Sequence, residues 1–125
     1  MAQGANHPVP TISTHVLDTE RGLPAAGIHV TLYRIAEDGR PLRLTQALTD
    51  ADGRVRDLLD RPLTAGDYRL EFNLVVVPVD GATTNPAADR FFRRVTLDLR
   101  VTDTARSYHV PLLLAPFSMT TYRGS

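Results

Sequence analysis

The sequence predicts an all-β domain built as an antiparallel sandwich of short strands. Three segments alternate apolar and polar side chains, as strands with one buried and one solvent-facing side do; they are residues 28–33, 69–74 and 95–101. Turn-forming residues rich in Gly, Asp and Pro separate the segments, at 21–24, 37–39, 50–53, 65–67 and 79–81. Short strands with frequent turns are typical of a sandwich of two sheets.

Chain length and local composition indicate one domain with a loose N-terminal arm. The 125 residues suit a single domain. Residues 1–10 are expected to form a flexible arm, and residues 11–125 the folded domain. One short helix of about two turns fits the sequence from Asn85, a capping residue, through Pro86 at the first helical position to Phe92.

The composition excludes several classes of chemistry and partner. There is no cysteine, which rules out disulfides and thiolate metal sites and suits a reducing, cytoplasmic location. All 14 basic residues are Arg, so a lysine nucleophile or Schiff base is excluded. These residues balance 14 acidic ones, and a net charge of zero gives no electrostatic footprint for nucleic acid.

No membrane partner is expected either. Residues 1–10 lack the basic start and the apolar run of a signal peptide. The longest apolar runs, near 74–79 and 110–114, are far too short to span a bilayer.

Two of the four histidines are candidates for chemistry. His7 lies in the arm and His29 on the polar side of a strand, so both are expected to be solvent-exposed. His15 and His109 each lie on the strand face opposite a mostly apolar row, within residues 12–18 and 108–114. A lone histidine in a strand is more often solvated or hydrogen-bonded than catalytic, and spacing does not show whether these two meet.

Other catalytic motifs are missing from the sequence. There is no HxH or HExxH spacing for a metal, no Gly-x-Ser-x-Gly elbow, and no glycine-rich phosphate or dinucleotide loop. Asp50 and Asp52 flank a turn, where aspartate serves turn geometry. We therefore expect neither a metal nor a cofactor.

The end of the chain allows two interpretations. The last residues follow the apolar segment 110–114 with no linker; they are Thr121, Tyr122, Arg123, Gly124 and Ser125. A frayed tail is one interpretation. In the other, the tail carries its aromatic ring, its guanidinium and a free carboxylate back into a pocket.

Three segments, in this order and at suitable spacing, resemble the 5-hydroxyisourate hydrolases of the transthyretin-related family. The first comprises STHVLDT at 13–19 and GLPAAG at 22–27, and the second is TDADGR at 49–54. The third runs from YHVPLLL at 108–114 to the closing YRGS at 122–125. This closing sequence is similar to the hallmark that separates the hydrolases from transthyretin itself, and the match covers about two-thirds of the chain.

The resemblance implies a transthyretin-like sandwich of about eight strands and a homotetramer with pockets at a subunit interface. It implies that a purine-derived small molecule, 5-hydroxyisourate, is hydrolysed to 2-oxo-4-hydroxy-4-carboxy-5-ureidoimidazoline in urate degradation. By the same resemblance the catalytic residues are His15, Arg54 and His109. The residues that bind substrate are Thr121, Tyr122, Arg123 and Ser125.

The roles follow from side-chain chemistry. One histidine deprotonates a water, since an unperturbed imidazole pKa of about 6.5 lies near working pH. Arg54 stays protonated and grips a carbonyl or anionic oxygen. Tyr122 stacks on the ring or hydrogen-bonds to it. Arg123 anchors the tail through an ion pair, and the terminal carboxylate of Ser125 orients a histidine or pairs with an arginine.

The chain departs from the family pattern away from these positions. Relatives carry an aromatic-containing helix after the strand at 68–73, where this chain has an apolar run and a turn. Arg93 and Arg94 replace a usual Pro-Glu, and residues 118–120 replace a usual Gly-Tyr-Ser. Two alternatives stay open. One is a transthyretin-like module that binds a small molecule without hydrolysing it. The other is a structural sandwich of immunoglobulin type.

Overall fold

The computed structural model describes residues 9–75 and 90–124, and these residues form strands and turns. Within this part of the chain there is no helix, and Arg90 to Phe92, the end of the predicted helix, are not helical; the rest of that prediction lies outside the described residues. The strands are β1 Ile12–Asp18, β2 Leu23–Pro24, β3 His29–Ile35, β4 Pro41–Leu48, β5 Arg54–Val55, β6 Gly66–Asn73, β7 Arg94–Val101, β8 Tyr108–Leu114 and β9 Met119–Thr121.

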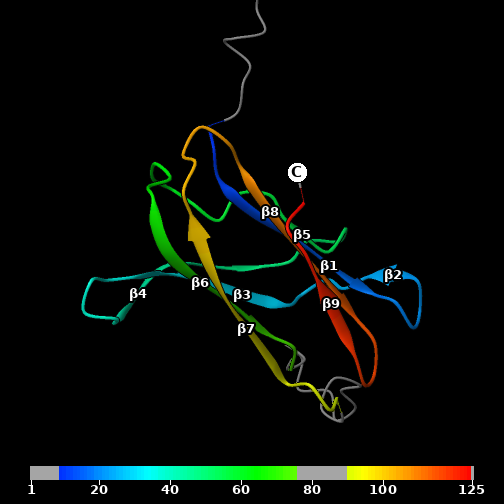
Figure 1. The fold of residues 1–125 in the computed structure, drawn as a ribbon. Helices are drawn as coiled ribbons and strands as arrows, with labels where there is room; N and C mark the ends of the chain where they lie inside the picture. The colour runs from blue at the N-terminus through cyan, green and yellow to red at the C-terminus, as the bar shows by residue number, and fades with distance from the viewer. Residues whose placement is uncertain (1–8, 76–89, 125) are drawn as a thin grey trace, which may run out of the picture.

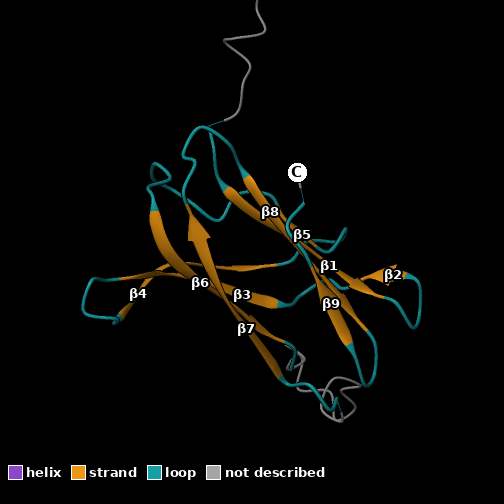
Figure 2. Ribbon diagram, viewed as in Figure 1, coloured by secondary structure: helices purple, strands orange, loops and turns teal. Residues whose placement is uncertain are grey.

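The strands form two sheets that face each other (Figure 1, Figure 2). The first sheet has the order β2-β1-β8-β9, with β5 also paired to β1, and the second has the order β4-β3-β6-β7. The predicted all-β sandwich is therefore confirmed. One pair, β1 with β8, is parallel, whereas all the other paired strands are antiparallel.

The core lies between the sheets and is filled from alternate positions of the strands. In β6, residues Tyr68, Leu70 and Phe72 are buried, and the residues between them are half-buried. The same alternation buries Ile12 and Val16 of β1. Each such side chain contributes about 1.5–3 kcal/mol when it leaves water. The predicted strands at 28–33, 69–74 and 95–101 correspond to β3, β6 and β7.

The strand β4 was not predicted from the sequence. It lies at the edge of the second sheet, where only Leu44, Thr45 and Ala47 are half-buried, so its pattern of apolar residues is weak. Its pairing with β3 shifts register between Leu32 and Tyr33. An edge strand is held mainly by backbone hydrogen bonds and needs little apolar side-chain signal. No helix in the described part of the chain is long and apolar enough to cross a membrane.

Candidate active site

The parallel pairing of β1 with β8 brings the two candidate histidines onto one face of the first sheet. Ser13 lies opposite His109, and His15 lies opposite Pro111. Because Ile12, Thr14 and Val16 are buried in the core, Ser13 and His15 face outward. His109 likewise lies between two buried residues and faces the same way. The predicted faces are thus confirmed, and neighbouring strands carry the two imidazoles.

The His109 side chain is held by a side chain of β1, that of Ser13. Its Nδ1 lies 2.8 Å from the Oγ of Ser13, a hydrogen-bonding distance. Burial lowers the pKa of His109 below the ordinary value, and the nearby charges of Arg54 and His15 lower it further. The imidazole is therefore predominantly neutral at pH 7.

His15 is held by the turn before β5. Its Nε2 lies 2.9 Å from the carbonyl oxygen of Asp52. A carbonyl only accepts hydrogen bonds, so Nε2 must carry the proton. In the neutral ring the lone pair then lies on Nδ1.

The turn that meets His15 is itself fixed by a carboxylate and a glycine. One carboxylate oxygen of Asp50 accepts hydrogen bonds from the backbone N–H groups of Asp52 and Arg54, each at 2.9 Å. The hydrogen bond from the Arg54 N–H is the main reason why the pKa of the Asp50 carboxyl lies below its usual value. Gly53 has a φ of 76°, and a Cβ there would lie 2.3 Å from the backbone oxygen of Val16. Only glycine lets the turn approach β1 so closely.

Arg54 is brought beside the histidines by this turn. It begins β5 and lies directly opposite His15 in the antiparallel pairing with β1. Its side chain is half-buried, and no described residue accepts a hydrogen bond from its guanidinium. The three predicted catalytic residues therefore come from adjacent strands, β8, β1 and β5, on one outer face.

A small cavity lies beside Arg54 and His109, and His15 is not among its lining residues. It has a volume of about 150 Å³, and we call it the histidine pocket; its lining residues are Ser13, Thr14, Arg54, Arg56 and His109. Ser13 and Arg56 were not predicted as site residues. Alternation along β1 placed Ser13 on the face of His15, but its contact with His109 depends on pairing between residues 96 positions apart. Within the described ranges, no three histidine or acidic side chains gather as ligands for a metal.

The tail folds back along β8 and does not fray within the described residues. Thr121 is paired with Leu112, and the N–H of Gly124 donates to the carbonyl of His109 at 2.7 Å. A Cβ at Gly124 would lie 3.0 Å from Cδ2 of the His109 ring. The tail therefore borders one side of this imidazole, and Ser125 lies outside the described residues.

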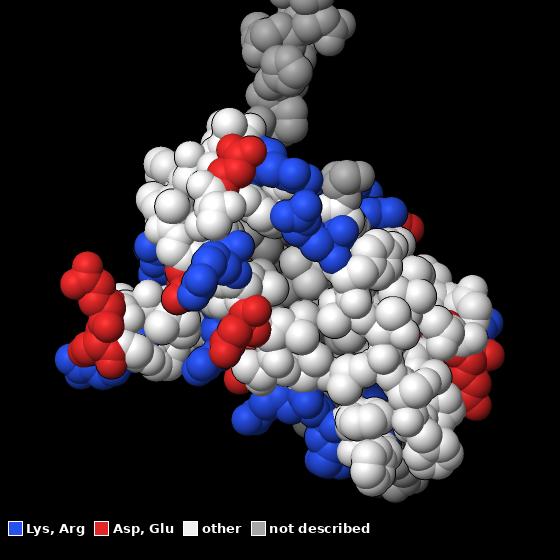
Figure 3. Space-filling view, viewed as in Figure 1, with Lys and Arg blue, Asp and Glu red and all other residues white. Residues whose placement is uncertain are grey.

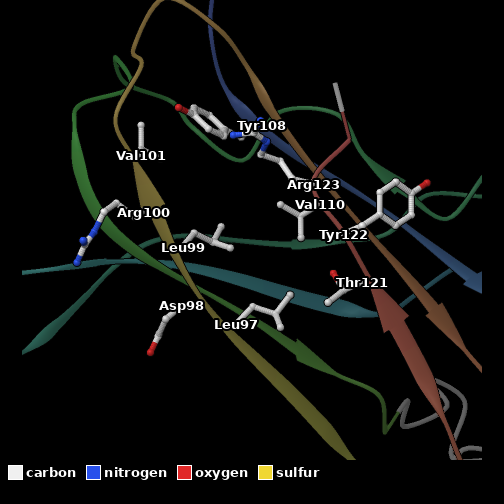
Figure 4. A pocket seen from close by; sticks show the side chains of 10 residues that line it. All are labelled: Leu97, Asp98, Leu99, Arg100, Val101, Tyr108, Val110, Thr121, Tyr122 and Arg123. Atoms are coloured by element: carbon white, nitrogen blue, oxygen red, sulfur yellow. The ribbon is translucent and has the colours of Figure 1, made fainter.

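Other tail side chains face a second, larger cavity between the sheets. This inter-sheet cavity has a volume of about 330 Å³, and Thr121, Tyr122 and Arg123 lie at its edge with residues of β7 and β8 (Figure 4). Arg123 points toward Tyr108, with its Cζ 6.0 Å from the ring centroid, whereas the Tyr122 ring points away from the cavity (Figure 4). The Thr121 Oγ1 donates to the carbonyl of Pro111 at 2.8 Å.

The two cavities are lined by different predicted site residues: Arg54 and His109 line the histidine pocket, Thr121, Tyr122 and Arg123 line the inter-sheet cavity, and His15 lines neither. The inter-sheet cavity is larger, but its floor is aliphatic, from Leu97, Leu99 and Val110, and no histidine lines it. Several arginine side chains lie on the face of the molecule that Figure 3 shows, around a largely uncharged area. The histidine pocket holds an imidazole, which can serve as a general base, and arginine donors, which can stabilise developing negative charge. The histidine pocket is therefore the candidate site for the chemistry.

The fold and site together define an all-β sandwich of transthyretin type that carries a histidine–arginine pocket on the outer face of one sheet. Comparison with known proteins gives the family. The chain belongs to the HIUase/Transthyretin family, whose model matches residues 12–124.

Individual relatives are similar over nearly the whole chain. The 5-hydroxyisourate hydrolase of Deinococcus radiodurans is 44% identical over 118 residues, covering 93% of this chain and 97% of that protein. That of Caulobacter vibrioides is 40% identical over 116 residues, covering 91% and 97%. The solved 5-hydroxyisourate hydrolase of Klebsiella pneumoniae superimposes with a TM-score of 0.73 at 34% identity, covering 93% of this chain and 99% of that one. Transthyretin from Sparus aurata gives 0.77 at 26% identity, covering 94% and 97%.

Proposed function

We propose that this protein hydrolyses 5-hydroxyisourate by opening its six-membered cyclic amide ring. The observation that carries the proposal is the gathering of His15, Arg54 and His109 on one outer face, where Arg54 and His109 line a small pocket and His15 lies opposite Arg54 on the neighbouring strand. Relatives named 5-hydroxyisourate hydrolase that are 40–44% identical support the same substrate. The reaction belongs to urate degradation, and its product is 2-oxo-4-hydroxy-4-carboxy-5-ureidoimidazoline.

In the proposed reaction His109 activates a water. Its lowered pKa keeps the imidazole neutral at pH 7 and able to accept a proton. When Nδ1 donates to Ser13, the lone pair lies on Nε2, the nitrogen that takes the proton from water. His15, fixed by the Asp52 carbonyl, orients the water and substrate through its Nδ1.

Arg54 stabilises the charge that the attack creates. The water oxygen bonds to the amide carbon, and negative charge develops on the carbonyl oxygen. A guanidinium beside that oxygen acts as a preorganised donor, and loss of one such donor commonly costs about 10²–10³-fold in turnover. The carbon–nitrogen bond then breaks, the ring nitrogen takes the proton held by His109, and the new carboxylic acid loses its proton.

The tail is proposed to complete the site. Tyr122 lies between Thr121 and Gly124, the two tail residues that pair with β8, and its ring points away from the inter-sheet cavity (Figure 4). We assign it to stacking on the planar substrate. Thr121 and Arg123 hold the tail in place through the Pro111 carbonyl and the Tyr108 ring. The substrate-binding role of Ser125 stays a prediction from the sequence.

A homotetramer is proposed as the assembly. Large apolar side chains are exposed near the β8–β9 turn; Phe91 and Phe117 are 69% and 81% exposed, and their ring centroids lie 6.4 Å apart. The area over β9 is largely free of charged side chains (Figure 3). Exposed apolar patches of this kind favour association. Sedimentation velocity at micromolar protein should give four times the chain mass, and a monomer would contradict the assembly. A cytoplasmic location stays a prediction from the cysteine-free sequence.

The alternative is a binding protein without hydrolase activity. Similarity to sea bream transthyretin, solved in complex with thyroxine, supports it with a TM-score of 0.75 at 27% identity. A binding module has no need of two imidazoles held by Ser13 and Asp52 around a guanidinium, so we favour the hydrolase.

One assay separates the two functions. Urate oxidase generates 5-hydroxyisourate in the cuvette, and the ultraviolet absorbance of this compound decays slowly on its own. The protein should accelerate the decay, and His15→Ala and His109→Ala should each lower turnover at least about 10²-fold with an unchanged circular dichroism spectrum. No acceleration at micromolar protein would leave the binding module as the better account.

A further inference from the structure

A second guanidinium lies at the histidine pocket, and neither the sequence motifs nor the proposed reaction uses it. Arg56 lines the pocket together with Arg54 and His109. We propose that Arg56 is a further substrate-binding residue of this site, where it recognises the anionic, oxygen-rich edge of a planar purine-derived ligand. The inference rests on the proposed function and adds a residue and a charge preference to it.

Local backbone geometry explains why both arginines face the pocket. Arg54 and Val55 form β5, and Arg56 follows in a bend; Val55 is buried in the core, whereas Arg54 and Arg56 both line the histidine pocket. Arg54 and Arg56 therefore both face outward from the first sheet. Arg54 lies directly opposite His15 in the pairing of β5 with β1. Arg56 is exposed and lies at the outer edge.

The guanidinium of Arg56 is available to a ligand. Its only ion pair among the described residues joins Nη2 to Oδ2 of Asp52 at 3.9 Å, and the two side chains are 69% and 71% exposed. An exposed pair at such a distance contributes little to stability. A bound anion can therefore replace Asp52 as the partner of Arg56 at small cost.

The charges around the pocket favour the binding of a negatively charged ligand. Two guanidiniums line it, His109 is neutral, and no acidic side chain belongs to the lining. The carboxylate of Asp50 is engaged by the backbone N–H groups of its own turn. The planar guanidinium of each arginine can donate two parallel hydrogen bonds to a pair of oxygen atoms on a flat ring. The pocket is therefore built for an anion.

The test compares Arg56→Gln and Arg56→Lys with the native protein in the 5-hydroxyisourate assay. A contact at the outer edge is made equally by the bound substrate and the transition state, so its loss raises KM and leaves kcat unchanged. We expect Arg56→Gln to raise KM about tenfold with kcat within about twofold, and Arg56→Lys to recover part of the loss. Arg40→Gln is the matched control, because Arg40 is an exposed arginine in the distant β3–β4 turn that also pairs with an aspartate.

Two outcomes would overturn the inference. In the first, the native protein is active but the KM of Arg56→Gln lies within about twofold of the native KM. This result would refute the role of Arg56 and leave the proposed function intact. The other concerns binding of urate, a planar anion that the enzyme does not hydrolyse, measured by calorimetry. Urate should bind several-fold more weakly to Arg56→Gln, and equal affinity would refute the role of Arg56 even if the native protein proved inactive as a hydrolase.

Discussion

The contact between the tail and the His109 ring makes Gly124→Ala a sharp perturbation of the site. A methyl group at Gly124 would lie 3.0 Å from Cδ2 and 3.4 Å from Cβ of His109. Non-bonded carbons rest at about 3.5–4.0 Å, so the ring or the tail must move by roughly 0.5 Å. Gly124 has no positive φ, and alanine fits its backbone without strain.

The expected loss of activity follows from this displacement. The ring is restrained by the 2.8 Å contact with Ser13, and the tail by the 2.7 Å hydrogen bond of Gly124. Because a misplacement of about 1 Å costs on the order of 10²-fold, a shift of half that size should lower kcat about tenfold. Thermal stability should hardly change, since the substitution is at the end of the chain.

Steady-state turnover of 5-hydroxyisourate and a thermal melt check this prediction. Thr120→Ala is the control, because Thr120 is an exposed residue of β9 in the same terminal segment. Turnover of Gly124→Ala within about twofold of native would refute the reasoning that the tail fixes the position of the imidazole.

Four further predictions concern the pH dependence of activity and of stability, the chain end and the turn. Because folding lowers the pKa of His109 and the neutral ring is the reactive form, the acid limb of kcat/KM should have its midpoint below pH 6.5. Below about pH 6.5 the unfolded chain then binds more protons than the native one, so His109 should make the free energy of unfolding fall as pH drops. A denaturation midpoint that rose on acidification through the titration of His109 would contradict this prediction. A tag fused after the last residue should lower activity far more than one fused before the first, and equal activities would remove the tail from the mechanism. Gly53→Ala should lower the free energy of unfolding by about 2 kcal/mol in urea titrations, because a methyl at positive φ meets the β1 backbone; an unchanged midpoint would contradict the clash.

The strands that could be predicted are those with a strong two-residue alternation. Residues 69–74 and 95–101 bury one side against the core, and this leaves a clear apolar row in the sequence. The short strands β2 and β5 and the edge strand β4 have no such row, because backbone pairing holds them. Alternation alone therefore identifies central strands better than edge strands.

The site residues were identified by resemblance, and their convergence was beyond local reasoning. The alternation in β1 placed His15 on the outward face, but nothing in the spacing indicates that β1 lies parallel to β8. That pairing alone brings Ser13 to His109. Arg56 was missed for a related reason: an exposed arginine in a turn is common, and only the pocket sets it apart.

The parallel pairing of β1 with β8 has a consequence for how the enzyme is made. The strands β1 and β8, which lie far apart in the sequence, must pair, and Arg54 of β5 must join them. Only then are the residues of the proposed reaction assembled. Such long-range closure is slow compared with forming local hairpins. A nascent or truncated chain that has formed only its local hairpins lacks the assembled site, so catalytic activity would report the long-range closure.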